Sequence, residues 1–271
     1  MKNSFGISQM TDDQTDAESA PELRGGTFIS DLHLFCPRSV SAETHEELSQ
    51  FQDASQCIVL GGDIFDFRWS THASHDASLA AAREWLEELL AVTGESQIVF
   101  LPGNHDCVPE FLEDLESLAA SQPRFSWHDH HVQINDCLFL HGDILDAGPS
   151  LDHLAEYRSK FHHSEPKSQL SQRSYDVAVA MRIHKLIPSL IRLPRRTCKE
   201  LLGTLRKMEL ADSSSVQRVF FGHTHVAING IEVDGVTFFN PGGSLRHLKT
   251  HDHHFSFVDE GERNSGQPRH E

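Results

Sequence analysis

The chain has 271 residues, enough to bury a substantial core, and its 40 acidic against 23 basic side chains give a net charge of −17. That acidic excess disfavours a polyanionic partner such as nucleic acid, and five cysteines without a CxxC pair favour a reduced, cytoplasmic setting over a disulfide framework. We expect a soluble protein, because the N-terminus has no apolar signal-peptide core and no run approaches the roughly 20 apolar residues of a membrane span.

Residues 1–24 are polar and acidic, so a disordered tail is expected there, with a second one over 261–271. Between them, over 25–260, short apolar runs alternate with helical patterns, which is typical of an α/β domain. Helical spacing is clearest over 79–92 and from Pro109, where proline occupies a first-turn position.

Turn residues separate the strands expected in the second half of the chain. Asn135-Asp136 is predicted to join two strands into a hairpin. Further turns between closing strands are predicted at Asn229-Gly230 and Asp234-Gly235.

The segment 150–210 lacks strand character and is predicted to form helices interrupted by prolines. Within residues 151–210 twelve basic side chains oppose six acidic ones, so this segment carries +6 while the rest of the chain carries −23. Two interpretations stay open: ordinary amphipathic helices packed on the sheet, or a helical lid that offers apolar surface and positive charge to an acyl- or phosphate-bearing substrate. Candidates for binding such a substrate are Arg192, Arg195 and Arg196.

Five apolar runs along the chain end abruptly in residues that bind metals. Ligand sites in open α/β sheets lie outside the carboxyl ends of the strands, so these side chains should share one rim. The predicted metal ligands are Asp31, His33, Asp63, Asn104, His141, His223 and His225. A pair of divalent cations needs a bridging anion, for which Asp63 is suited, and mixed nitrogen and oxygen donors favour Mn²⁺, Fe²⁺, Zn²⁺ or Mg²⁺.

These strand ends resemble, in order, the motifs of the calcineurin-like metallophosphoesterases. The motifs are D-x-H (31–33), GGD (61–63), GNHD (103–106), HGD (141–143) and GHTH (222–225). The resemblance implies an α/β fold, a four-layer αββα sandwich with a helical insertion. It also implies one metal held by Asp31, His33, Asp63 and His225, and a second by Asp63, Asn104, His141 and His223.

The resemblance further implies a reaction. A hydroxide bridging two metal ions, expected to be Mn²⁺, would attack a phosphoester or pyrophosphate bond. His105 is the candidate catalytic residue, stabilising or protonating the leaving group. Asp106 is expected to orient His105 or to cap the following turn. Asp66, Asp143 and Asp146 are expected to support the metal-bound imidazoles or to serve as turn residues.

The substrate is predicted from the GDIFDFRWS segment and from the insertion between HGD and GHTH, which resemble the UDP-2,3-diacylglucosamine hydrolase branch. That branch cuts a pyrophosphate in lipid A synthesis, which implies a nucleotide-linked glycolipid and peripheral contact of 150–210 with the inner face of the membrane. The chain departs from the branch at His105, where GNHD stands in place of GNRD. A general phosphomonoesterase or phosphodiesterase, and a non-catalytic scaffold that binds a membrane or partner, are the alternatives.

Overall fold

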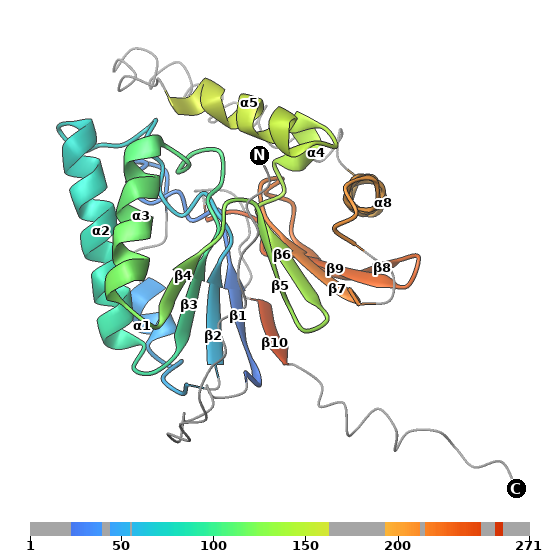
Figure 1. The fold of residues 1–271 in the computed structure, drawn as a ribbon, viewed down its shortest axis with the longest axis horizontal. Helices are drawn as coiled ribbons and strands as arrows, with labels where there is room; N and C mark the ends of the chain where they lie inside the picture. The colour runs from blue at the N-terminus through green and yellow to red at the C-terminus, as the bar shows by residue number, and fades with distance from the viewer. Residues whose placement is uncertain are drawn as a thin grey trace, which may run out of the picture.

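The computed structural model describes residues 23–39, 44–54, 56–162, 193–211, 215–244 and 253–256. Nearly all of the predicted tails (1–24 and 261–271) lies outside these residues, as does the middle of the predicted insertion with Arg192. The described chain forms two five-stranded sheets that pack against each other (Figure 1).

The first sheet is mainly parallel and is covered by helices on one face (Figure 1). Its strands, in spatial order, are β10 (His253–Ser256), β1 (Gly25–Ile29), β2 (Gln56–Leu60), β3 (Gln97–Phe100) and β4 (Phe125–Trp127). Only β10 runs antiparallel to its neighbour. The covering helices are α1 (Thr44–Leu48), α2 (His75–Val92) and α3 (Pro109–Ser121).

The second sheet has three parallel central strands and an antiparallel strand at each edge. Its spatial order is β5 (His131–Ile134), β6 (Cys137–Leu140), β7 (Arg218–Phe221), β9 (Val236–Asn240) and β8 (Ile228–Val233). The helix α8 (Pro194–Lys207) packs on this sheet, while α4 (Ile144–Ala147) and α5 (Leu151–His162) lie across the top of both sheets (Figure 1).

Three apolar layers hold the fold together. Alternation along β2 shows how they arise: Ile58 and Leu60 belong to the core under α1–α3, whereas Val59 belongs to the core between the sheets. A third core lies between the second sheet and α8, where Leu201 and Leu205 are fully buried. Two sheets with helices outside each of them form the predicted αββα sandwich.

Two of the three predicted turns are found where expected. Asn135 (φ 52°) joins β5 to β6, and Asp234 (φ 49°) with Gly235 (φ 83°) joins β8 to β9. The turn predicted at Asn229-Gly230 is wrong, because β8 continues through these residues with a shift in its pairing to β9. This shift in pairing is a β-bulge, a feature that a glycine within a strand often marks.

The helices predicted within the described residues are present, and the start of α2 differs from its prediction. α2 begins at His75 rather than at residue 79, because Ser74 caps it by accepting a hydrogen bond from the Ala77 amide. Both ends of the predicted insertion are helical, as α5 and α8. No helix within the described residues is long and apolar enough to cross a membrane.

Candidate metal centre

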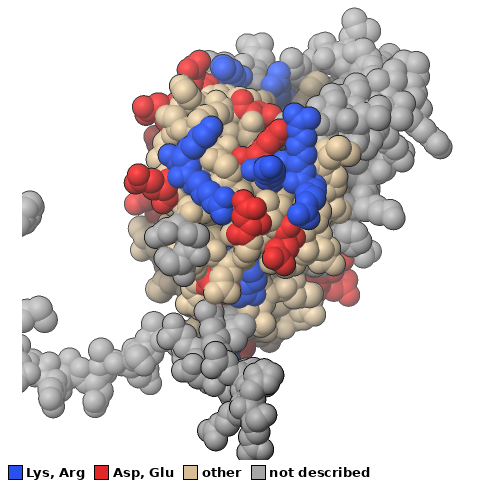
Figure 2. Space-filling view, turned by 90° about the vertical axis from the view of Figure 1, so that its right-hand side faces the viewer, with Lys and Arg blue, Asp and Glu red and all other residues tan. Residues whose placement is uncertain are grey.

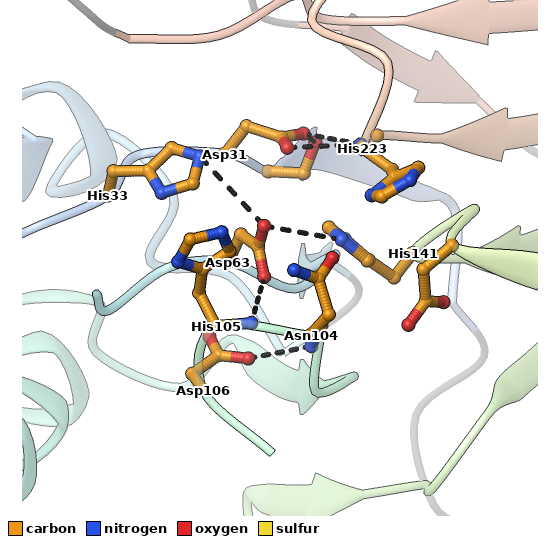
Figure 3. Close-up of polar contacts among 12 residues, drawn as sticks. Asp31, His33, Asp63, Asn104, His105, Asp106, His141 and His223 are labelled. Carbon is orange, nitrogen blue, oxygen red and sulfur yellow. Dashed lines mark hydrogen bonds and ion pairs between the residues drawn. The ribbon is translucent and has the colours of Figure 1, made fainter. Parts of the chain in front are cut away.

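The seven predicted ligands all follow parallel strands and lie at the rim where those strands end (Figure 3). Asp31 and His33 follow β1, Asp63 follows β2 and Asn104 follows β3; His141 follows β6, and His223 and His225 follow β7. Because both sheets end at the same rim, side chains far apart in sequence converge there.

Asp63 stands between two groups of side chains that could each hold a metal ion. In the first group, ligand atoms of Asp31, His33, Asp63 and His225 lie within 4.8 Å of one another, and in the second those of Asp63, His141 and His223 do so. One carboxylate oxygen of Asp63, Oδ2, lies 3.9 Å from His33 Nε2 and 3.5 Å from His141 Nε2 (Figure 3). Asp63 is therefore placed to be shared by both groups.

Two buried polar atoms of the predicted ligands have no hydrogen-bond partner among the described residues: Asn104 Oδ1 and His141 Nε2. Leaving such an atom unsatisfied costs about 1–3 kcal/mol, so a native protein normally gives it a partner. His141 Nδ1 is fixed by the Gly61 carbonyl at 3.0 Å, which directs Nε2 toward Asp63. An amide oxygen and an imidazole nitrogen beside a shared carboxylate fit a divalent cation.

The backbone at the centre is held in an unusual conformation. Asp31 (φ 55°), His33 (φ 47°), Asp63 (φ 52°), His223 (φ 64°) and His225 (φ 53°) all have positive φ. This left-handed region costs an ordinary residue roughly 1–2 kcal/mol, so the surrounding fold must impose it. Such strain tends to cluster at functional sites.

Two motif glycines are required because side chains approach them closely. A Cβ at Gly103 would overlap the Asp63 carboxylate, and a Cβ at Gly222 would overlap the Asp31 carboxylate and the Ser30 side chain. The glycines of GNHD and GHTH thus let the ligands pack against bare backbone.

Electrostatics explains how the buried carboxylates stay ionised. Burial alone would raise the pKa of Asp63, but His141, His105 and His33 surround it and hold that pKa well below its usual value. Burial disfavours the charged imidazolium of His141, yet the Asp63 carboxylate raises the pKa of His141 to about 10. In the metal-free protein, a proton on His141 therefore offsets part of the acidic charge of Asp63.

His105 lies next to the metal ligands and pairs with Asp66. Its Nδ1 is 3.1 Å from Asp66 Oδ1, and the other oxygen of Asp66 is 3.6 Å from His33 Nδ1. Burial opposes the charge on His105, but Asp63 and Asp66 raise its pKa to about 9. Asp66 thus supports one predicted ligand and the predicted catalytic residue together.

Asp106 caps a turn instead of orienting His105. Its carboxylate accepts hydrogen bonds from the amides of Gly103 (2.6 Å) and Ile64 (2.8 Å). Burial, together with the Asp63 charge, raises the pKa of Asp106 to about 7. The expected cap of the following turn is not what these bonds show, because the amides that Asp106 holds precede it in the chain.

The helix α5 contributes residues that the motifs did not indicate. The Tyr157 ring lies 6.4 Å from the His223 ring, and one turn later the Phe161 ring lies 5.7 Å from His105. Arg158 fastens the helix with bonds of 2.7 and 3.1 Å to Asp143 and one of 2.7 Å to the Asp129 carbonyl. The only sequence signal for Tyr157 and Phe161 was their i, i+4 spacing on a predicted helix.

Of the three arginines predicted to bind substrate, Arg192 lies outside the described residues, and the contacts of Arg195 and Arg196 are made away from this centre. Arg195 donates a hydrogen bond of 3.3 Å to the carbonyl of Glu232 in β8. The rim-side end of β8 is Ile228, which pairs with Asn240, so Glu232 lies four residues away from that end. Arg196 pairs with Glu200 at 3.0 Å on the exposed side of α8. Figure 2 shows that basic and acidic side chains are interleaved on this face of the molecule.

A two-sheet sandwich with an Asp/His cluster at its rim is a fold and site suited to a metal-dependent enzyme. The family model described as calcineurin-like phosphoesterase matches residues 27–227, and the chain belongs to this family of metal-dependent hydrolases that act on phosphoester bonds. No curated protein matches the chain.

Proposed function

We propose that this phosphoesterase is a two-metal enzyme, with Asp63 shared between the metal positions. The observation that carries the proposal is the placement of Asp63 Oδ2 between His33 and His141, beside the unsatisfied Asn104 Oδ1. Asp31, His33, Asp63 and His225 would hold one cation, and Asp63, Asn104, His141 and His223 the other. Bound there, divalent cations such as Mn²⁺ supply Lewis acidity, polarising the phosphoryl group and lowering the pKa of water so that hydroxide can attack.

The protein's own contribution centres on His105. Its Nδ1 faces Asp66, so its Nε2 is the atom available to pass a proton to the leaving oxygen. Phe161 packs at 5.7 Å on one side of the imidazole and limits its movement. The pair His105–Asp66 thus protonates the leaving oxygen, while the ligands of the two metals hold the cations that would polarise the attacked phosphoryl group.

The bond cleaved is proposed to be a pyrophosphate in a nucleotide-linked glycolipid of the UDP-2,3-diacylglucosamine type. Support comes from the GDIFDFRWS segment and from α5, which presents the rings of Tyr157 and Phe161 beside the centre. The basic excess of 151–210 favours contact with the inner face of a membrane, where such a lipid would be found.

A second candidate is a general phosphomonoesterase or phosphodiesterase. The observation that favours it is the His105–Asp66 pair, since a positioned imidazole can protonate a simple alkoxide leaving group. The scaffold alternative is weaker, because all seven ligand positions keep residues that bind metals.

The proposal is tested by hydrolysis of a substrate panel with Mn²⁺: a UDP-diacylglucosamine analogue, bis(p-nitrophenyl) phosphate and p-nitrophenyl phosphate. Release of UMP from the lipid would support the pyrophosphatase, and preference for either chromogenic ester would support the second candidate. Asp63→Asn should lose turnover and bound metal together, whereas His105→Ala should lose turnover and keep the metal.

The matched control is Asp234→Asn, an exposed aspartate with a similar positive φ of 49°. It should retain both metal and turnover. Two metal equivalents bound to Asp63→Asn, or hydrolysis of no substrate by the metal-loaded wild type, would refute the proposed function.

A further inference from the structure

One side chain beside the centre has a buried donor that the family motifs do not explain. Arg68 is half-buried, and its Nε has no hydrogen-bond partner in the described part of the chain. No carboxylate of the described residues lies within ion-pair distance of its guanidinium. A buried N–H of a cation without an acceptor is costly, so it is expected to have one when the protein works.

The backbone that carries Arg68 is attached to the metal centre. Asp66 Oδ1 accepts a hydrogen bond of 2.9 Å from the Trp69 amide and also lies 3.1 Å from His105 Nδ1. Asp66 Oδ2 lies 3.6 Å from His33 Nδ1. The turn 66–69 is therefore fixed by the same carboxylate that supports the centre, so the backbone of Arg68 has a fixed position relative to His33 and His105.

The guanidinium of Arg68 and the imidazole of His105 share one aromatic neighbour. The Cζ of Arg68 is 5.5 Å from the centroid of the Phe161 ring, and that ring is 5.7 Å from the His105 ring. A cation over an aromatic face keeps its N–H edge available, because the ring contacts the flat face of the guanidinium. Phe161 thus links Arg68 to the residue proposed to serve the leaving group.

Arg158 gives an internal comparison. It is likewise close to the centre, but its guanidinium is saturated by Asp143 and the Asp129 carbonyl. Arg158 is a structural cation paired with the Asp143 carboxylate, whereas the Nε of Arg68 has no acceptor among the described residues.

We propose that Arg68 binds the phosphoryl group on the leaving side of a diphosphate ester, and so makes the centre select diphosphate esters over monoesters. The planar guanidinium fork matches two phosphate oxygens, and a phosphoryl group held on the His105 side supplies the acceptor that Arg68 lacks. The inference rests on the proposed function, since it assigns a recognition residue to the same centre.

The test compares Arg68→Met with the wild type on a nucleoside diphosphate ester and on p-nitrophenyl phosphate. Methionine keeps an apolar stem against Phe161 and removes the charge and the donors. The ratio of kcat/KM for the diphosphate ester to that for the monoester should fall about 10–100-fold, the effect expected for one charged hydrogen-bonding group. Arg68→Lys should fall between the two, because it keeps the charge without the fork.

Arg83→Met is the matched control, because Arg83 lies on α2 and pairs with Glu87 at 2.9 Å. It should leave that ratio unchanged. An equal loss of Arg68→Met on both substrates, or no loss on the diphosphate ester, would overturn the assignment.

A binding measurement separates this inference from the proposed function. Calorimetric titration with an α,β-methylene nucleoside diphosphate needs no turnover. Weaker binding to Arg68→Met than to the wild type supports the assignment of Arg68, even if the wild type hydrolyses no substrate. The absence of hydrolysis would refute the proposed function and leave the assignment of Arg68 standing. Equal binding to both proteins, or no binding to either, overturns the role of Arg68.

Discussion

Replacing Arg158 by alanine tests whether α5 is fastened to the rim by a buried ion pair. Arg158 is 5% exposed, Asp143 is 1% exposed, and the two share bonds of 2.7 and 3.1 Å. Removing one partner of a buried pair leaves the other charged and unpaired, at a cost of about 3–5 kcal/mol. At roughly 2–4 °C per kcal/mol for a protein of this size, the melting temperature should fall by roughly 6–20 °C.

The assay is thermal unfolding of the metal-free protein, with three variants compared. Arg196→Ala is the control, since its partner Glu200 is half-exposed and the exposed pair is worth about 0.5 kcal/mol or less. The double variant Arg158→Met with Asp143→Asn should unfold at a higher temperature than Arg158→Ala, because it buries no unpaired charge. A loss below about 1 kcal/mol for Arg158→Ala would show that the pair does not hold α5 in place.

Three further outcomes are expected. Gly103→Ala should abolish metal binding by displacing Asp63, and metal analysis checks this. Gly203→Ala, which has open space around the new methyl group in α8, should instead raise the free energy of unfolding by about 0.5–1 kcal/mol, as thermal unfolding would show. Metal affinity should fall about tenfold for each pH unit between pH 9 and pH 7, because the ion must displace the proton from His141, whose pKa is raised to about 10. Competition with a chelator measures this affinity, and equal affinities at pH 9 and pH 7 would contradict the prediction. Removing a metal present at 100 times its Kd should cost about 2.7 kcal/mol of stability, a drop of several degrees in melting temperature, and an unchanged melting temperature would show that no ion was bound there.

The rim of the site could be predicted because its signals are local, whereas the four-layer sandwich was expected only from the resemblance to a known family. An apolar run followed at once by Asp31 or Asp63 marks the end of a buried parallel strand, and parallel strands end at a common edge. Five such ends in order specified which side chains would meet. Chain-order motifs therefore carried most of the long-range information about the site.

The helix over the site could not be predicted in the same way. The i, i+4 pair Tyr157 and Phe161 shows only that two rings share one helix face, and nothing local says which surface that face meets. Asp143 and Arg158 are 15 residues apart, and their pairing depends on how α5 crosses the rim. Such contacts follow from tertiary packing and leave no periodic trace in the sequence.

One local rule failed, and another was incomplete. Asn229-Gly230 has the composition of a hairpin turn, but pairing with β9 on both sides of it keeps the strand continuous. Asp66 lies 3.6 Å from His33 Nδ1 and accepts from the Trp69 amide, as expected of a turn residue that supports a ligand imidazole, and it also pairs with His105. Long-range pairing with β9 overrode the local preference of Asn229-Gly230, and long-range packing added the contact of Asp66 with His105.

The metal centre itself is where local preference and observed structure disagree most. His33 and Asp63 adopt left-handed backbone that their residue types rarely adopt, and Asn104 and His141 bury polar atoms that have no partner in the part of the chain that the structure describes. These features lower stability, and the three apolar layers beneath the rim are what offset them. Features that lower stability persist where ligand binding compensates for them. The strained backbone and the unsatisfied polar atoms are both concentrated around the Asp63 carboxylate, and this is a physical argument for cation binding that does not depend on any motif.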